Sequence, residues 1–138
     1  MFTFTIIADI NFENQREFIQ TAEIVMKKIR KEKGCLSCHL VKDTENEKVF
    51  LLMEEWKTRE DLFRHVCSDC FGALSGALQL LSNKTETKIY SVSLTQGIEM
   101  LTKVRDHNKF KKRRLIKNGS EQNIIKQIAE SGISIQIS

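Results

Sequence analysis

The sequence predicts an α+β fold in which one antiparallel sheet carries its helices on a single face. Three observations lead to this prediction. Four segments show the period-two alternation and β-rich composition of strands, helical apolar stripes lie between them, and a short polar turn joins the middle two strands. The resulting order, β-α-β-β-α-β, is the split βαβ pattern of the ferredoxin-like fold.

The N-terminal half supplies the first strand, a long helix and a hairpin. Residues 2–10 alternate as a strand, and a helical stripe follows. The apolar members of this stripe are Phe18, Ala22, Val25, Met26 and Ile29. We expect Gly34 to end the helix as its C′ residue. Strands over 36–42 and 49–56 are separated by so short a link that they form an antiparallel hairpin.

Two short helices and a fourth strand complete the predicted domain. Thr58 begins a capping-box type of helix start, and Ser68 caps a second short helix. Their apolar faces contain Leu62, Phe63 and Val66 in the first helix and Phe71, Leu74, Leu78 and Leu81 in the second. Residues 84–94 alternate as the last strand. Because the helices cover one face, the other face is bare, which predicts a homodimer.

An extension, residues 96–138, follows the predicted domain of residues 1–95. The apolar pattern indicates a helix over 96–105 and another over 121–131, with a basic stretch of unassigned form between them. Isoleucines at period two over 133–137 indicate a last strand. Isoleucine side chains in this pattern have to be buried against other apolar groups, so we expect the extension to dock onto another surface.

The net charge of +4 is concentrated in this extension. Residues 99–138 contain nine lysines and arginines against four acidic residues, so the body of the chain is nearly neutral. The run KKRR at 111–114, within the basic stretch 108–117, is of the kind that binds phosphate-rich polymers, although such runs are more often solvated surface. Phe110 is the one aromatic residue here, which disfavours a stacking platform for single strands.

Composition excludes several classes of protein. A chain of 138 residues with 41% hydrophobic and 29% charged residues is ordinary for one soluble domain with a tail. Its apolar runs are far shorter than the ~20 residues that span a bilayer, so no membrane partner is expected. Charged side chains within residues 1–20 exclude a secretory signal peptide, and we expect a cytoplasmic protein.

Four motifs within the domain point to a family. GCLS at 34–37 follows the first helix, and the ExW motif at 54–56 closes the third strand. His65 lies in the next helix, before SDCF at 68–71. In this order and spacing the motifs resemble the antibiotic biosynthesis monooxygenase domain family, which includes the YgiN-like quinol monooxygenases. The resemblance covers about residues 1–95.

The resemblance implies a dimeric α+β barrel that uses molecular oxygen without flavin, haem or metal. A deprotonated hydroquinone can itself pass an electron to oxygen, so the protein needs an apolar pocket, a base and a hydrogen-bond donor. His65 is the expected catalytic base, and Trp56 is expected to stack on the substrate ring and donate from its indole nitrogen. The expected apolar walls of the substrate pocket are Phe4, Phe63, Phe71 and Leu78. Core positions for Trp56 and His65 are the structural alternative.

The cysteines leave a metal site as another alternative. Cys35 and Cys38, with Cys67 and Cys70, form two C-x-x-C pairs of the kind that bind zinc. However, 28 residues separate the pairs, more than the usual ~15–20, and strand positions three apart point to opposite faces. A redox pair at Cys67 and Cys70 is a second possibility. Buried, inert thiols are the favoured interpretation, with no metal.

Two haem functions are also weighed. The segment CLSCH at 35–39 matches the c-type haem attachment motif, but that chemistry belongs to exported proteins. A haem-degrading branch resembles this domain and uses an asparagine on the first strand and an axial histidine in the helix. Here residues 2–10 hold no asparagine and Ser75 stands at the histidine position, which argues against haem breakdown.

The sequence thus predicts a cofactor-independent monooxygenase that oxidises a hydroquinone or polycyclic phenol with molecular oxygen. The first alternative is a non-catalytic small-molecule-binding or stress-response domain of the same fold. The second is contact with a nucleic acid or a protein partner through the basic extension.

Overall fold

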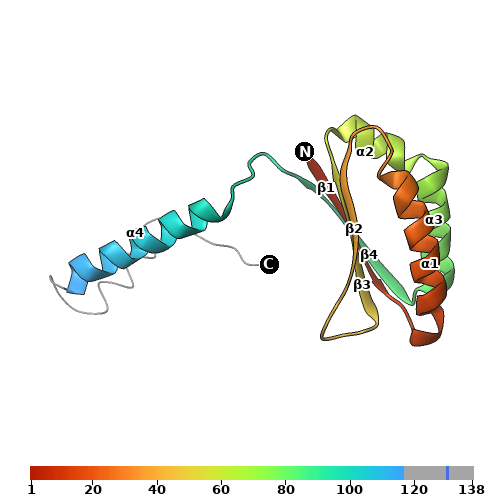
Figure 1. Ribbon diagram of the computed structural model, residues 1–138, viewed down its shortest axis with the longest axis horizontal. Coiled ribbons are helices and arrows are strands. Elements are labelled where there is room, and N and C mark those ends of the chain that lie inside the picture. Colours follow the sequence, from red (N-terminus) through yellow and green to blue (C-terminus); the bar gives the residue numbers. More distant parts are fainter. Residues whose placement is uncertain (117–129, 131–138) are drawn as a thin grey trace. The chain divides into compact units, whose positions relative to one another are not determined.

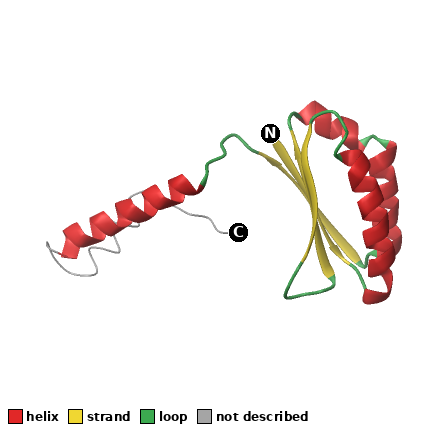
Figure 2. Cartoon of the chain, viewed as in Figure 1, coloured by secondary structure: helices red, strands yellow, loops and turns green. Residues whose placement is uncertain are grey.

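The computed structural model describes residues 1–116 and Glu130. The chain divides into two compact units, Met1–Ser93 and Leu94–Ser138. The elements of the first unit are β1 (Phe2–Asp9), α1 (Phe12–Ile29), β2 (Cys35–Lys42), β3 (Val49–Trp56), α2 (Arg59–Val66), α3 (Asp69–Leu81) and β4 (Lys84–Ser91). Their order, which can be followed in Figure 2, confirms the predicted ferredoxin-like α+β fold.

The four strands form one antiparallel sheet in the order β2-β3-β1-β4. Figure 1 shows α1, α2 and α3 on the same face of this sheet. Alternation along the two central strands directs one row of side chains toward these helices. This row consists of Phe4, Ile6 and Ala8 on β1 and Phe50, Leu52, Glu54 and Trp56 on β3. Glu54 is the one charged residue in this apolar row, and a buried charge of this kind is a candidate for a functional role.

The opposite face of the sheet carries no helix of the Met1–Ser93 unit (Figure 1). Ile7, Val41 and Tyr90 point to this face and expose 38%, 49% and 48% of their surfaces. An exposed apolar face of this kind is what a contact with a second copy of the chain would need, so the homodimer remains a prediction.

Gly34 lies in the turn that leads into β2 and does not cap α1. The helix ends at Ile29 with Arg30 as its C-cap, so the prediction of a C′ glycine is wrong. Gly34 nevertheless has a φ of +83°, a conformation that L side chains rarely adopt. A Cβ at this position would lie 2.1 Å from Oδ2 of Asp61, at the start of α2. The turn between the first helix and the sheet therefore requires glycine for two reasons.

The second unit contains α4 (Ile98–Ile116). The sequence predicted a helix over 96–105 followed by a basic stretch of unassigned form, whereas the structure has one continuous helix. No glycine or proline interrupts residues 98–116, and lysine and arginine are good helix formers, so the helix runs through the basic stretch. The helix expected over 121–131 and the strand expected over 133–137 lie outside the described residues, apart from Glu130. None of the described helices combines the length and the apolar character needed to cross a bilayer.

Candidate functional site

A cluster of buried charged and aromatic side chains lies between β3 and α2. Glu54 and Trp56, at the end of the inward row of β3, are both 0% exposed. The indole Nε1 of Trp56 donates a hydrogen bond of 2.9 Å to Oε2 of Glu54. Among the described residues, Oε1 of Glu54 has no hydrogen-bond partner. A buried carboxylate is costly unless a positive charge lies nearby, so this cluster needs a cation.

His65 on α2 is the group that meets this need. It is fully buried, and its Nε2 lies 3.2 Å from Oε2 of Glu54, an ion-pair distance without hydrogen-bond alignment. Its Nδ1 lies 3.0 Å from both carboxylate oxygens of Glu32. The imidazole stacks on Trp56 with ring centroids 4.6 Å apart, and Phe71 meets it edge-on at 5.4 Å. Glu32, His65 and Glu54 together are called the acid–histidine cluster below.

The protonation state of His65 follows from these contacts. Burial by itself lowers the pKa of His65, because it penalises the imidazolium, but the carboxylates of Glu54 and Glu32 outweigh burial and raise the pKa above the ordinary 6.5. The two carboxylates thus favour the imidazolium form of His65. Both ring nitrogens face these carboxylates, and Glu32 is the one partner with an exposed edge, at 23%.

Local sequence signals position the members of the cluster. Thr58 caps α2, its Oγ1 accepting a hydrogen bond of 3.1 Å from the backbone N–H of Asp61. Within α2, Leu62 and His65 are one helical turn apart and both face the sheet, which explains their complete burial. Glu32 lies in the turn after α1, the turn that Gly34 completes.

An open cleft of about 320 Å³ lies between α3 and strands β1 and β4, on the side of the sheet where β4 is the edge strand. Its apolar wall is formed by Ile6, Phe71 and Leu78. Its polar wall is formed by Ser75, Gln79, Ser82, Asn83, Lys84, Thr85 and Thr87. Phe71 lines the cleft and also contacts His65, so its ring connects the cleft with the acid–histidine cluster. The space at the centre of the helix–sheet interface, by contrast, is a cavity of about 10 Å³, no larger than one water.

The predicted site residues lie in three places: at the cleft, in the acid–histidine cluster, and on the exposed face of α2. Phe71 and Leu78 line the cleft, and Phe4 packs against Phe71 with ring centroids 5.9 Å apart. Trp56 and His65 lie in the cluster and not among the residues that line the cleft.

Phe63, the remaining predicted wall residue, lies outside the cleft and the cluster. Its side chain is 46% exposed, and the guanidinium of Arg59 lies 4.8 Å from its ring centroid. The reason is helical geometry: Leu62 and His65 occupy the buried face of α2, so the residue that follows Leu62 points to the surface.

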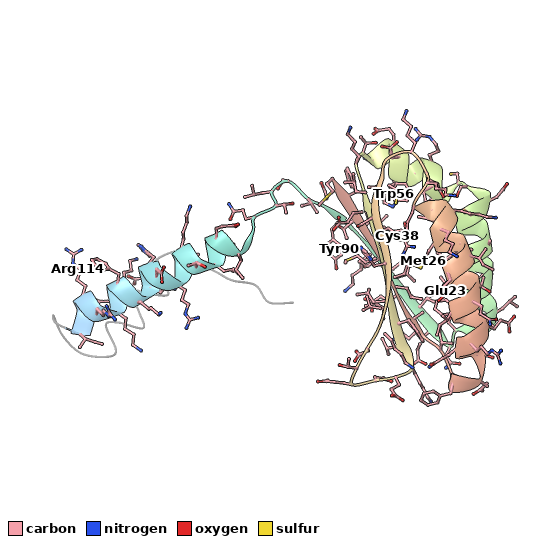
Figure 3. The ribbon with its side chains drawn as sticks, in the orientation of Figure 1. Glu23, Met26, Cys38, Trp56, Tyr90 and Arg114 are labelled. Atoms are coloured by element: carbon pink, nitrogen blue, oxygen red, sulfur yellow. The ribbon has the colours of Figure 1, made fainter. Side chains whose placement is uncertain are left out.

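A register shift in β2 changes the expected direction of the first cysteine pair. The shift lies between Cys35 and Ser37, so Cys35 pairs with Trp56 and Cys38 with Glu54. Both thiols therefore lie on the helix-facing side, where Figure 3 shows Cys38, and not on opposite faces as predicted. Burial raises the pKa of both thiols, that of Cys38 to about 12, with a further contribution from the Glu54 carboxylate. Thiols of this kind are poor nucleophiles.

The second pair lies elsewhere. Cys67 is exposed at the end of α2, and Cys70 is half-buried on α3, where burial raises the pKa of its thiol. In the part of the chain that the structure describes, no three histidine, cysteine or acidic side chains are arranged to hold a metal ion. The two C-x-x-C pairs thus do not assemble the four-thiolate site that was weighed as an alternative.

The described fold and site can be compared with known proteins. A conserved protein from Methanosarcina mazei is 27% identical, with 64% of this chain and 89% of that chain covered and a TM-score of 0.62. A Deinococcus radiodurans protein named for the antibiotic biosynthesis monooxygenases is 19% identical, with coverage of 71% and 98% and a TM-score of 0.67. None of the curated proteins matches this chain. A family model described as antibiotic biosynthesis monooxygenase matches residues 1–76, more than half of the chain.

The chain belongs to the antibiotic biosynthesis monooxygenase family. The matched region runs from β1 into α3 and contains the whole acid–histidine cluster. The β4 side of the cleft lies beyond it. SnoaB from Streptomyces nogalater, a cofactor-independent oxygenase, has the same fold at 16% identity, with 68% of this chain and 94% of that chain covered and a TM-score of 0.61. The family match thus includes the cluster and ends before β4.

Sequence reasoning missed both carboxylates of the cluster. Glu54 carried a signal, because it stands between Leu52 and Trp56 at the inward positions of an alternating strand, where a charge demands a partner. Glu32 carried none, since its contact with His65 depends on how the turn after α1 folds back over α2.

Proposed function

We propose that this antibiotic biosynthesis monooxygenase domain is a quinol-type, cofactor-independent monooxygenase that oxidises a hydroquinone or polycyclic phenol in the cleft between α3 and β4. The observation that carries the proposal is the position of Phe71. Its side chain lines the cleft, and its ring also contacts the buried imidazole of His65. A planar ring between Ile6, Phe71 and Leu78 would have apolar contacts, with the hydroxyl and amide groups of the opposite wall available to its oxygen atoms.

In the proposed reaction the substrate is the only reductant. Loss of a hydroxyl proton gives an electron-rich anion that transfers an electron to O₂, and recombination of the two radicals forms a C–O bond. One oxygen atom stays in the product, and the other leaves as water with two hydrogens of the substrate. The acid–histidine cluster supports this chemistry because two carboxylates and one imidazolium leave it with a net negative charge, which favours uptake of the substrate proton.

His65 is proposed to relay this proton: the imidazolium passes its Nδ1 proton to Glu32, the exposed end of the relay, and the neutral ring can then accept the proton of the substrate. Direct transfer from a ligand in the cleft requires the ring of Phe71 to turn aside, since that ring meets the imidazole edge-on. Trp56 is proposed to hold Glu54 in place through its indole N–H and not to stack on the substrate. His65 thus remains the catalytic candidate, and its role changes from a free base to a member of a charged relay.

Oxygen uptake with a panel of hydroquinones and anthrols, corrected for autoxidation and without added cofactor, tests the proposal. Ser75→Trp should fill the cleft and lower kcat/KM at least ~10-fold, because the substrate loses its binding position. Leu80→Trp is the matched control, since Leu80 lies on the same helix with 84% of its surface exposed. Equal rates for the two variants would place the reaction outside the cleft.

The non-catalytic alternative has one observation in its favour. Both nitrogens of His65 face carboxylates, an arrangement that also suits a purely structural ion cluster. A ligand that binds wild-type protein and not Ser75→Trp, without oxygen uptake, would identify a small-molecule-binding domain.

We also propose that two copies pair through the open face of the sheet. Ile7, Val41 and Tyr90 provide its exposed apolar surface. Sedimentation should give a dimer for the wild-type protein, and Ile7→Lys should shift the population toward monomer because it places a charge in the apolar face. Phe63→Lys, at an exposed position on α2, should leave the dimer intact. A wild-type monomer at micromolar concentration would contradict the pairing.

A further inference from the structure

Helix α4 concentrates positive charge in a folded element that the proposed oxygenase reaction does not use. Its residues 98–116 include seven lysines and arginines against two acidic residues. Glu99 lies in the first turn, and Arg113 and Arg114 lie in the last, which suits the helix dipole and stabilises the helix in this form. The positive charge is therefore presented on a regular scaffold.

Helical spacing collects four of the basic residues into a stripe. Arg105, Lys109, Lys112 and Arg113 follow the spacing i, i+4, i+7 and i+8, which places them on one face. All four are exposed, and within the described residues none takes part in an ion pair. The stripe extends over about 12 Å at a rise of ~1.5 Å per residue. Over that length a nucleic-acid duplex carries about seven phosphate charges.

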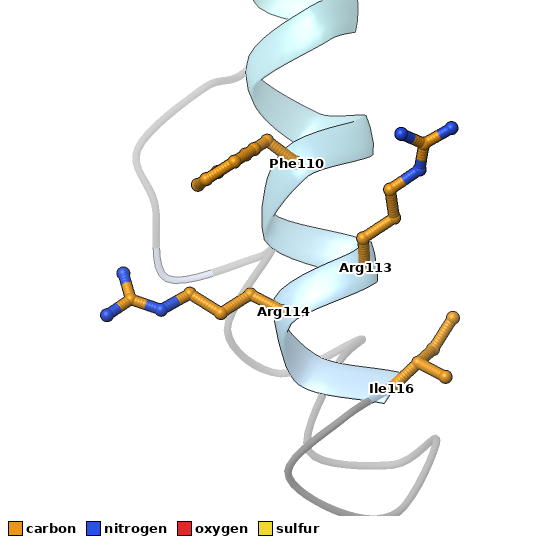
Figure 4. Close-up of a pocket in the computed structure, with 4 residues that line it drawn as sticks. All are labelled: Phe110, Arg113, Arg114 and Ile116. Atoms are coloured by element: carbon orange, nitrogen blue, oxygen red, sulfur yellow. The ribbon is translucent and has the colours of Figure 1, made fainter.

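Figure 4 shows that the two arginines at the end of α4 project on opposite sides of the helix. With Phe110 and Ile116 they line a hollow of about 520 Å³. Arg113 thus belongs to the stripe, whereas Arg114 projects away from it. The apolar side chains Phe110 and Ile116 also lie on different sides in this view.

These positions favour a nucleic acid over a membrane as the partner. A helix that lies on a membrane needs one continuous apolar face, and the exposed apolar residues of α4 are distributed around it. A single strand is also disfavoured, since Phe110 is the one aromatic residue of α4 on which a base could stack. We infer that α4 binds the phosphate backbone of a nucleic-acid duplex through the stripe of Arg105, Lys109, Lys112 and Arg113, without reading its sequence.

Binding of the full chain to a short fluorescent DNA duplex, measured over a range of salt concentrations, tests the inference. Four phosphate contacts predict a slope of log K against log salt of about −3.6. The variant Arg105→Gln/Lys109→Gln/Lys112→Gln/Arg113→Gln should lose most of this slope and bind at least ~10-fold more weakly at low salt. Glutamine preserves helix propensity, which circular dichroism can verify.

The matched control removes the same amount of charge from the other unit. The variant Lys27→Gln/Lys28→Gln/Lys31→Gln/Lys33→Gln changes four exposed lysines on and just after α1 and should retain the affinity and slope of the wild type. Three results would overturn the inference: no duplex binding at low salt, equal loss in both variants, or binding to anionic phospholipid vesicles without binding to the duplex.

Discussion

Gly34→Ala is expected to lower the free energy of unfolding by about 2–3 kcal/mol, a large share of the stability of a small domain. A non-glycine residue at a φ of +83° is strained, and the added Cβ would meet the side chain of Asp61 at 2.1–2.5 Å. Relief of that contact must displace Asp61 and the start of α2, and α2 carries His65. Chemical denaturation followed by the fluorescence of Trp56, the single tryptophan of the chain, measures the effect.

Gly72→Ala and Gly76→Ala are the controls for this prediction. Both glycines lie inside α3, and apart from the neighbouring residues and backbone of the helix itself, no atom lies within 4 Å of a Cβ at either position. Alanine should stabilise the helix there, by up to ~1 kcal/mol. If Gly34→Ala proved as harmless as these two, the account of the turn between α1 and β2 would be wrong.

Glu54→Gln is expected to destabilise the domain by about 3 kcal/mol, because it removes one carboxylate from a fully buried ion cluster and keeps its volume. His65 would then be buried with Glu32 as its remaining charged partner. Glu55→Gln is the matched control, since the neighbouring side chain points to the opposite face of the sheet, and its effect should stay within about 0.5 kcal/mol. Equal effects of the two substitutions would show that Glu54 has no special role.

The same variant should also change the pH dependence of stability. The folded-state pKa of His65 is raised above 6.5, so its stabilising contribution is complete below that pH and is lost as pH rises through the folded-state value. The wild-type protein should therefore lose stability as the pH rises above about 6.5. Glu54→Gln should flatten this decline, and an unchanged decline would assign it to another group.

The sequence predicted the architecture well because its signals are local. Alternation along β1 and β3, the short hairpin link, and the caps at Thr58 and Ser68 each report the conformation of neighbouring residues. These signals, combined with the order of the elements, were sufficient for the fold.

The site was harder to predict because it depends on contacts between distant segments. The Glu32 contact, 33 residues from His65 in sequence, follows from the fold of a turn that no periodicity describes. The register shift in β2, which turned Cys35 to the helix-facing side, is likewise set by pairing with β3. Phe63 is exposed for a different reason: an apolar residue next to a buried one on a short helix does not have to be buried.

Incorporation of labelled oxygen tests the central claim most directly. The wild-type protein, without added cofactor, would be incubated with a hydroquinone or anthrol under isotopically labelled O₂ in unlabelled water, and the product would be analysed by mass spectrometry. The account predicts one labelled oxygen atom per product molecule, formed faster than by autoxidation and lost in Ser75→Trp and not in Leu80→Trp. A product that carries no labelled oxygen, or the same rate with and without protein, would contradict the proposed monooxygenase function.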